Sequence, residues 1–306
     1  MPLIYSIIAP LIIISSFAIY QGEAFTAIET ARLLQNCMLI AGIGTLLQLY
    51  PIRKIGSGLP VVMGISFTFL AACLATASQD YGIMVGAIIV GGCFEGVLGL
   101  TAKYWRKIIS PIVSACVVVS IGLSILNVGV SSFGSSSAYP LGSWQNLLVA
   151  TITLAAALSG GVFGCSPITS FSQNVGLISM THVVNRFTIM FGALAMILGG
   201  LFPPIGAFFT TLPDCVLGGC TVIMFGSIMM SGVRMMHDAG IDQRNTLIAA
   251  TSICLGVGVT QVDGFFNELP SFIGDIFAGN MVAGVFVVGL ILDLCLPRDH
   301  SHYTSM

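Results

Sequence analysis

Residues 166–181 read SPITSFSQNVGLISMT, a polar stretch that contains proline and glycine and carries no charge. It lies among runs of apolar residues that are long enough to cross a membrane. Hydrocarbon holds no water to pair with loose backbone or side-chain amides, so such a stretch is tolerated only where it lines a cavity inside the protein. The pattern therefore predicts that residues 166–181 form a binding site within a membrane protein.

The composition of the whole chain is typical of a polytopic membrane protein. Apolar residues make up 56% of the 306 positions and charged residues only 7%, whereas a soluble domain carries about 25% charged residues. The mean hydropathy is +1.01. We therefore expect an all-α, multi-pass protein of the cell (inner or plasma) membrane, surrounded by lipid. The net charge of −2 comes without a basic cluster, so no nucleic-acid partner is expected.

Ten apolar segments are expected to form helices, since a span needs about 20 residues. Their predicted ranges are 3–20, 33–50, 58–78, 82–101, 108–130, 145–164, 187–210, 214–233, 246–260 and 279–297.

Positive charges mark the cytoplasmic ends of these segments. Lys107 and Arg186 both lie at such ends, so the chain between them must cross the membrane an even number of times. That stretch offers three candidate crossings, at 108–130, 145–164 and 165–183. The charges therefore predict either a re-entrant segment or a missing one at this place.

A second segment, residues 58–69, is interrupted in the same way as residues 166–181, with proline, glycine, serine and threonine ahead of apolar helix. Interrupted segments at matching positions in two halves indicate a transporter site built from inverted repeats. The ends of half-helices offer backbone N–H groups and a dipole to a ligand. The alternative is that proline and glycine only kink packed helices.

Gln173 and Asn174 are the strongest polar groups of the first stretch. Each amide offers two donors and an acceptor, which suits a planar ligand with amide-like edges. The alternative is that both side chains join neighbouring helices.

Two carboxylates lie inside predicted spans, and an acid within a membrane indicates a function by default. Asp293, however, lies about one turn from Pro297 and Arg298, so we expect it to reach the membrane surface. Glu95 lies about two turns from Lys103 and has the same route to water. The chain contains no Ser/His/Asp, HExxH or phosphate-loop arrangement, so we expect neither an enzyme nor a cofactor. The nine cysteines form no CxxC pair and predict no metal site.

Residues 173–181, QNVGLISMT, resemble the signature of the nucleobase/ascorbate transporter family, the xanthine/uracil permeases. That signature reads Gln, Glu or Pro, then Asn, any residue, Gly, four residues and Thr. Other blocks similar to the family are GIGTLLQ at 42–48, LPVVMG at 59–64 and SIGLSI at 120–125. The resemblance covers nearly the whole chain, and Gln173 makes it most like members that carry xanthine or uric acid.

The resemblance implies a role for individual residues. Gln173 hydrogen-bonds the nucleobase, Asn174 supports it, and Phe67 packs on the base. Phe171 and Ser172 are implied to line the site. Residues implied to shape the motif and its helix packing are Gly176, Thr181, Pro60, Gly64 and Ser66.

The resemblance also implies a fold of fourteen segments in two inverted sets. A core domain, here 1–102 and 159–212, would hold the site. A gate domain, here 103–158 and 213–306, would form a homodimer. Transport in the intact fold would be coupled to protons or to another cation.

The chain departs from the family in three places. His182 stands where the signature usually has Arg, Lys or Gly. The chain opens partway through the first span. Residues 145–164 join the front of the sixth span to the end of the ninth, so the seventh and eighth spans and most of the ninth are missing. The eighth span carries the acidic residue used for substrate binding and coupling. The fault in the charge pattern falls in the same stretch, which supports a deletion or a defective gene model.

We therefore expect a shortened purine permease of xanthine or urate type, with about ten to eleven segments of the family fold. Two other functions stay open. One is a transport-inactive subunit that dimerises through 108–130 and 214–297. The other is an anion transporter of the same fold, against which the Gln173–Asn174 pair argues.

Overall fold

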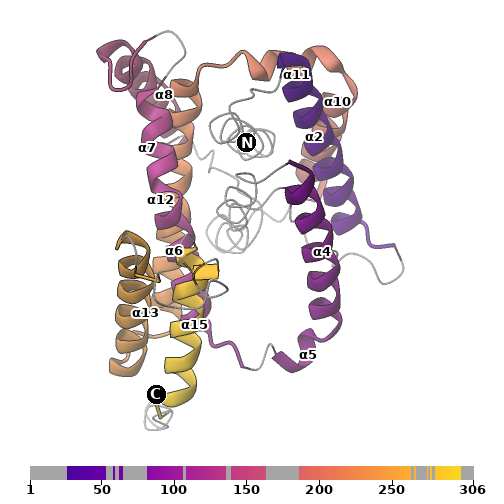
Figure 1. Cartoon of the computed structure of the whole chain (residues 1–306). Helices are drawn as coiled ribbons and strands as arrows, with labels where there is room; N and C mark the ends of the chain where they lie inside the picture. The colour runs from indigo at the N-terminus through magenta and orange to yellow at the C-terminus, as the bar shows by residue number, and fades with distance from the viewer. Residues whose placement is uncertain are drawn as a thin grey trace. The chain divides into compact units, whose positions relative to one another are not determined.

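The structure is a computed structural model, and it describes residues 26–52, 58, 62–64, 81–105, 108–135, 139–162, 186–262, 265–266, 274, 276–277 and 280–297. In this part of the chain the backbone is mainly helical and no β-strand occurs, which confirms the expected all-α fold (Figure 1). The predicted span 3–20, most of 58–78 and the polar segment 165–183 lie outside the described residues.

The described helices follow the predicted apolar segments along the chain. Their bounds are α2 (Ala27–Leu49), α4 (Tyr81–Leu100), α5 (Ala102–Trp105), α6 (Pro111–Ser124), α7 (Leu126–Gly134), α8 (Trp144–Val162), α10 (Arg186–Leu201), α11 (Pro203–Thr210), α12 (Asp214–Asp238), α13 (Gln243–Gln261) and α15 (Met281–Cys295).

Four helical stretches of the described chain are long and apolar enough to cross a membrane. They run over Ile28–Leu49, Gly82–Leu100, Pro111–Gly134 and Cys215–Asp238. All four coincide with predicted spans, so the expectation of an integral membrane protein is confirmed.

These helices expose large apolar side chains. On α4, for example, the side chains of Phe94 and Leu100 are 65% and 88% exposed. In water, continuous apolar surface of this kind would drive association. In a bilayer it carries no such cost, because lipid tails are equally apolar.

Two predicted helix boundaries differ from the structure for a local reason. Helix α2 begins at Ala27 rather than near residue 33, because Thr26 and Glu29 form a capping box. The Thr26 hydroxyl accepts from the Glu29 N–H at 3.3 Å, and the Glu29 carboxylate accepts from the Thr26 N–H at 2.9 Å. The predicted segment 187–210 is divided into α10 and α11 before Pro203, which has no N–H to continue the helix.

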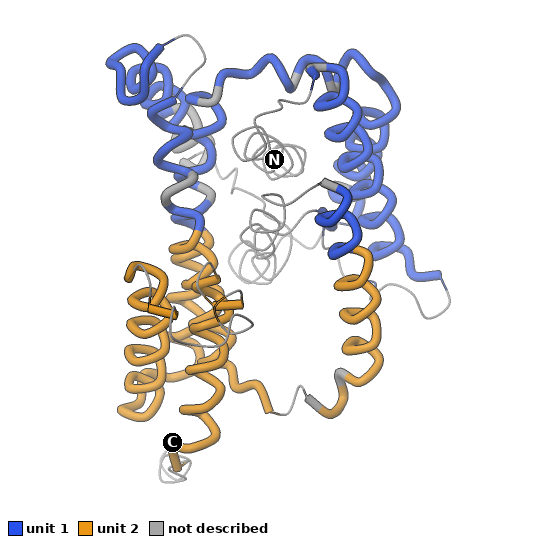
Figure 2. The backbone as a smooth tube through the Cα atoms, in the orientation of Figure 1, with its two compact units in different colours: residues 1–88, 125–227 blue, residues 89–124, 228–306 orange. Residues whose placement is uncertain are grey.

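The chain divides into two compact units, residues 1–88 with 125–227 and residues 89–124 with 228–306 (Figure 2). This division reflects which residues pack against one another. The core and gate ranges expected from the family are a division by function, and they stay a prediction.

In the first unit, α2 packs along α10 and also contacts α11. The two main helices approach closely at Gly200, where a Cβ atom would lie 2.8 Å from the Gln35 carbonyl oxygen. Leu34, Met38 and Met196 are fully buried in this unit. Small residues at such crossings let membrane helices gain van der Waals contact.

In the second unit, α13 packs on α15, and both pack on α6. The buried centre of this helix group consists of Ile112, Val113, Cys116, Ile248, Met281 and Val285. Helices α13 and α15 meet at Gly256, where a Cβ atom would lie 2.8 Å from the Val285 backbone nitrogen. The backbone of α15 cannot yield as a flexible side chain would, so this position requires glycine.

We expect Gly256→Ala to destabilise the protein because the added methyl group collides with the backbone of α15. Overpacking of this kind costs about 1–3 kcal/mol, which exceeds the gain of up to about 1 kcal/mol in helix propensity. The matched control is Gly258→Ala on the same helix, since no atom lies within 4 Å of a Cβ there. Thermal unfolding of the purified protein in detergent, followed by size-exclusion chromatography, should show a lower melting temperature for Gly256→Ala only. Equal melting temperatures would contradict the close approach.

Candidate functional site

Most residues of the predicted site fall outside the described part of the chain. These are Gln173, Asn174, Phe171, Ser172, Gly176 and Thr181 of the polar stretch, together with Pro60, Ser66 and Phe67 of the second interrupted segment. Their roles stay predictions. Gly64 is described, and it is half-buried at the end of the short segment 62–64.

Residues 62–64 have no helical backbone, although they lie inside the predicted span 58–78. Val62 is 2% exposed and belongs to a buried cluster with Ala41 of α2 and Met196 of α10. This part of the second interrupted segment therefore lies against the helix pair α2–α10, with Val62 as its apolar anchor.

Thr45 of α2 holds this segment by its backbone. Its buried hydroxyl oxygen accepts a hydrogen bond from the Met63 N–H at 2.8 Å and donates to the Ala41 carbonyl at 2.7 Å. One turn further along α2, the Gly58 N–H donates to the Gln48 carbonyl at 3.0 Å. Gly58 therefore lies beside Gln48, and Met63 lies beside Thr45, one turn earlier on α2.

Sequence reasoning did not single out Thr45, although a signal was present. It is a polar residue of the predicted span 33–50, within the block 42–48 that resembles the family. A threonine in a membrane helix usually bonds to its own helix, and that bond alone would satisfy it. Only the fold shows that the hydroxyl has a second partner, 18 residues away in the chain.

A second polar cluster contradicts the expectation for Asp293. Instead of reaching the membrane surface, its side chain is fully buried and forms an ion pair with Arg244 of α13, with 2.8 Å between Nη2 and Oδ1. The prediction was wrong because it considered only charges near Asp293 in the sequence. Arg244 lies 49 residues away and is brought to Asp293 by the packing of α13 on α15.

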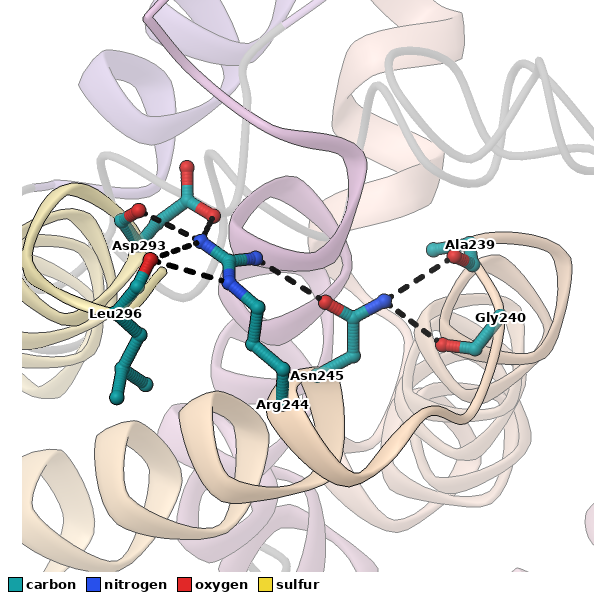
Figure 3. Close-up of polar contacts among 6 residues, drawn as sticks. All are labelled: Ala239, Gly240, Arg244, Asn245, Asp293 and Leu296. Carbon is teal, nitrogen blue, oxygen red and sulfur yellow. Dashed lines mark hydrogen bonds and ion pairs between the residues drawn. The ribbon is translucent and has the colours of Figure 1, made fainter. Parts of the chain in front are cut away.

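The Arg244 guanidinium also caps the C-terminal end of α15 (Figure 3). Nη2 donates to the Asp293 carbonyl at 2.7 Å, and both Nε and Nη2 lie within 3.4 Å of the Leu296 carbonyl. The last carbonyls of a helix have no partner within the helix and carry partial negative charge, so a buried cation is favourable there.

Asn245 extends this cluster to the turn between α12 and α13. Its Nδ2 donates to the carbonyls of Gly240 at 3.0 Å and Ala239 at 3.3 Å, and its Oδ1 lies 3.5 Å from Arg244 Nη1 (Figure 3). Arg244 and Asn245 thus join the end of α12, the start of α13 and the end of α15. The arrangement stabilises helix ends.

Glu95, the other carboxylate inside a predicted span, is exposed on α4. The structure assigns it no buried ion pair among the described residues. The predicted route of the Glu95 carboxylate to water stays a prediction.

Comparison with known proteins places these features in a family. The sequence model described as "Permease family", that of the xanthine/uracil permeases, matches residues 4–160 and 156–265. The two matched stretches meet at residues 156–160. This is within the segment 145–164, where the resemblance predicts an internal gap.

Three relatives cover nearly the whole chain. The xanthine permease XanQ of Escherichia coli is 26% identical over 409 residues, with 92% of this chain and 88% of XanQ covered. XanP of the same organism is 24% identical over 413 residues, covering 94% and 89%. The xanthine permease of Bacillus subtilis is 27% identical over 395 residues, covering 92% and 88%.

The length of the alignments also indicates that residues are missing from this chain. The alignment with XanQ is 409 residues long, whereas this chain has only 306. XanQ therefore contains many residues that have no counterpart here.

We expect Asp293→Asn and Arg244→Ala to lower the stability of the protein strongly, because each leaves the other partner of the ion pair without its countercharge. Breaking a buried pair costs about 3–5 kcal/mol. The matched control is Arg234→Ala, since Arg234 is exposed on α12. Thermal unfolding in detergent provides the measurement.

A double variant tests whether the loss arises from the unpaired charge. Combining Asp293→Asn and Arg244→Ala in one chain should cost less than the two single changes added, because no lone charge remains buried. Additive losses would contradict a direct interaction between the two side chains.

Proposed function

This chain belongs to the permease family of xanthine/uracil type, and from that premise we propose that it is a secondary active transporter of purine nucleobases, xanthine or uric acid. The observation that carries the proposal is the signature at residues 173–181, with glutamine at its first position. As a member of this family the chain is an integral membrane protein and not an enzyme.

The chemistry of the proposed site suits a purine. Gln173 offers donors and an acceptor that match the amide-like edges of xanthine and urate, and Asn174 supports it. Phe67 packs on the face of the base, as aromatic rings do with flat π-systems. Phe171 and Ser172 line the same site. The names of XanQ, XanP and the Bacillus subtilis relative support xanthine as the first substrate to test.

Transport then follows by alternate exposure of the site to the two sides of the membrane. In the proposed mechanism a core domain carries the Gln173 site past a gate domain, and the gate domains of two copies form the homodimer. The coupling ion is a proton or another cation.

Coupling is the step for which this chain lacks a candidate residue. The resemblance implies that the coupling acid belongs to the eighth span, which is missing. Asp293 does not replace it, because its carboxylate is held by Arg244 at the end of α15. We therefore propose that the chain recognises the purine, and we assign none of its residues to coupling transport to an ion.

The break at residues 156–160 favours one alternative function. A chain that lacks several spans of the core could still dimerise through 108–130 and 214–297. It would then be a transport-inactive subunit that pairs with another permease. The third possibility, an anion transporter of the same fold, fits poorly with the uncharged amide pair at 173–174.

Uptake of radiolabelled xanthine and urate by cells expressing the chain tests the proposal. We expect saturable uptake, and we expect Gln173→Ala to reduce kcat/KM at least about tenfold, because a site built for hydrogen bonds is left unpaired. The matched control is Gln261→Ala, since Gln261 is exposed at the end of α13 and should leave uptake unchanged. Uptake that is insensitive to Gln173→Ala would refute the site.

If the wild-type chain shows no uptake, the inactive-subunit function is tested next. If the chain inserts normally but transports neither purine, co-expression with Escherichia coli XanQ should lower xanthine uptake, and the two chains should copurify. Absence of both effects would exclude the inactive-subunit function as well.

A further inference from the structure

We propose that Thr45 is a positioning residue that sets the place of the second interrupted segment, and through it the aromatic wall of the purine site. The expected effect on substrate binding rests on the proposed function. Its structural half, the anchoring of residues 62–64, stands on contacts within the described chain.

The first step is the hydrogen bond to Met63. Non-helical backbone inside a membrane protein has no helical partner for its N–H groups, and a buried N–H without a partner is costly. The Met63 N–H donates to Thr45 Oγ1 at 2.8 Å, and Thr45 is fully buried. The Met63 side chain, by contrast, is 39% exposed. The segment is therefore held at this point by its backbone.

The second step is the orientation of the Thr45 hydroxyl. Its oxygen lies 2.7 Å from the Ala41 carbonyl of the preceding turn and 3.4 Å from the Met63 carbonyl, so the nearer Ala41 carbonyl is the better acceptor for its one hydrogen. When the Thr45 hydroxyl donates toward Ala41, the lone pairs of its oxygen point away from α2, toward Met63. Threonine is also stiff about χ1 in a helix, so the acceptor has a defined position.

The third step is the apolar packing beside this bond. Val62 is buried against Ala41 and Met196, and the Met63 Cβ would lie 3.4 Å from a Cβ at Gly44. The polar contacts of Thr45 with Met63 and the packing of Val62 on Ala41 and Met196 therefore hold residues 62 and 63 against α2 and α10.

The consequence for binding follows from chain connectivity. Phe67 lies only four residues after Met63. A displacement of about 1 Å in a positioned group can cost a site about a hundredfold in rate. Loss of the Thr45 anchor should therefore weaken purine binding although Thr45 itself is not a predicted contact.

Three variants separate positioning from general stability. Thr45→Val keeps the shape of the side chain but removes the hydroxyl, whereas Thr45→Ser keeps the hydroxyl. Thr151→Val is the matched control. The Thr151 hydroxyl makes the same bond within its helix, to the Leu147 carbonyl at 2.6 Å, but the residue is exposed on α8.

Hydrogen exchange of the protein in lipid nanodiscs tests the anchor without any substrate. In Thr45→Val, the amide of Met63 should exchange about five to ten times faster than in the wild type, because a net hydrogen bond is lost. Thr45→Ser should restore the slow exchange, and Thr151→Val should leave it unchanged. Equal exchange in Thr45→Val and the wild type would overturn the proposal.

Xanthine affinity tests the consequence for the site. The KM or Kd for xanthine should rise about tenfold in Thr45→Val, with recovery in Thr45→Ser. Accelerated exchange with unchanged affinity would overturn the link to the site while leaving the proposed function intact. If the wild type binds no xanthine, the proposed function fails, and the exchange experiment still decides the anchor.

Discussion

Polar groups of this protein find no water within the hydrocarbon of a membrane, and this constraint governs where each of them lies. The buried hydroxyls of Ser120 and Ser252 donate to carbonyls of their own helices, at 2.8 and 2.6 Å. Thr45 does the same and in addition accepts the N–H of Met63. The non-helical segment 62–64 is therefore stable on α2 because a polar side chain inside a span replaces the missing water.

The same constraint explains how charge is held in the second unit. The fully buried carboxylate of Asp293 is compensated by Arg244, whose guanidinium also binds carbonyls at the end of α15. Asn245 does the same for the end of α12. A buried pair of this kind adds little net stability relative to apolar residues, but it makes helix pairing specific because a shifted register would separate the charges.

Sequence reasoning located the helices better than their ends or their partners. The predicted segment 82–101 corresponds closely to α4, because a span is defined by a run of apolar residues that needs no tertiary contact. The start of α2 was misplaced, since the capping box of Thr26 and Glu29 is polar and hydropathy does not register it. The family resemblance predicted a gap within 145–164, the fault in the charge pattern falls in the same stretch, and the two family matches overlap inside it.

By itself the sequence determined that the chain is an all-α membrane protein of the permease family, because composition and the signature at 173–181 are properties of the chain alone. Only the tertiary structure decided how its polar residues are used. Thr45 meets Met63 across 18 residues, and Arg244 meets Asp293 across 49. The physical reason is that such bonds depend on helix packing. Closeness in sequence to Pro297 and Arg298 therefore predicted the wrong surroundings for Asp293, and the second partner of Thr45 was not predicted.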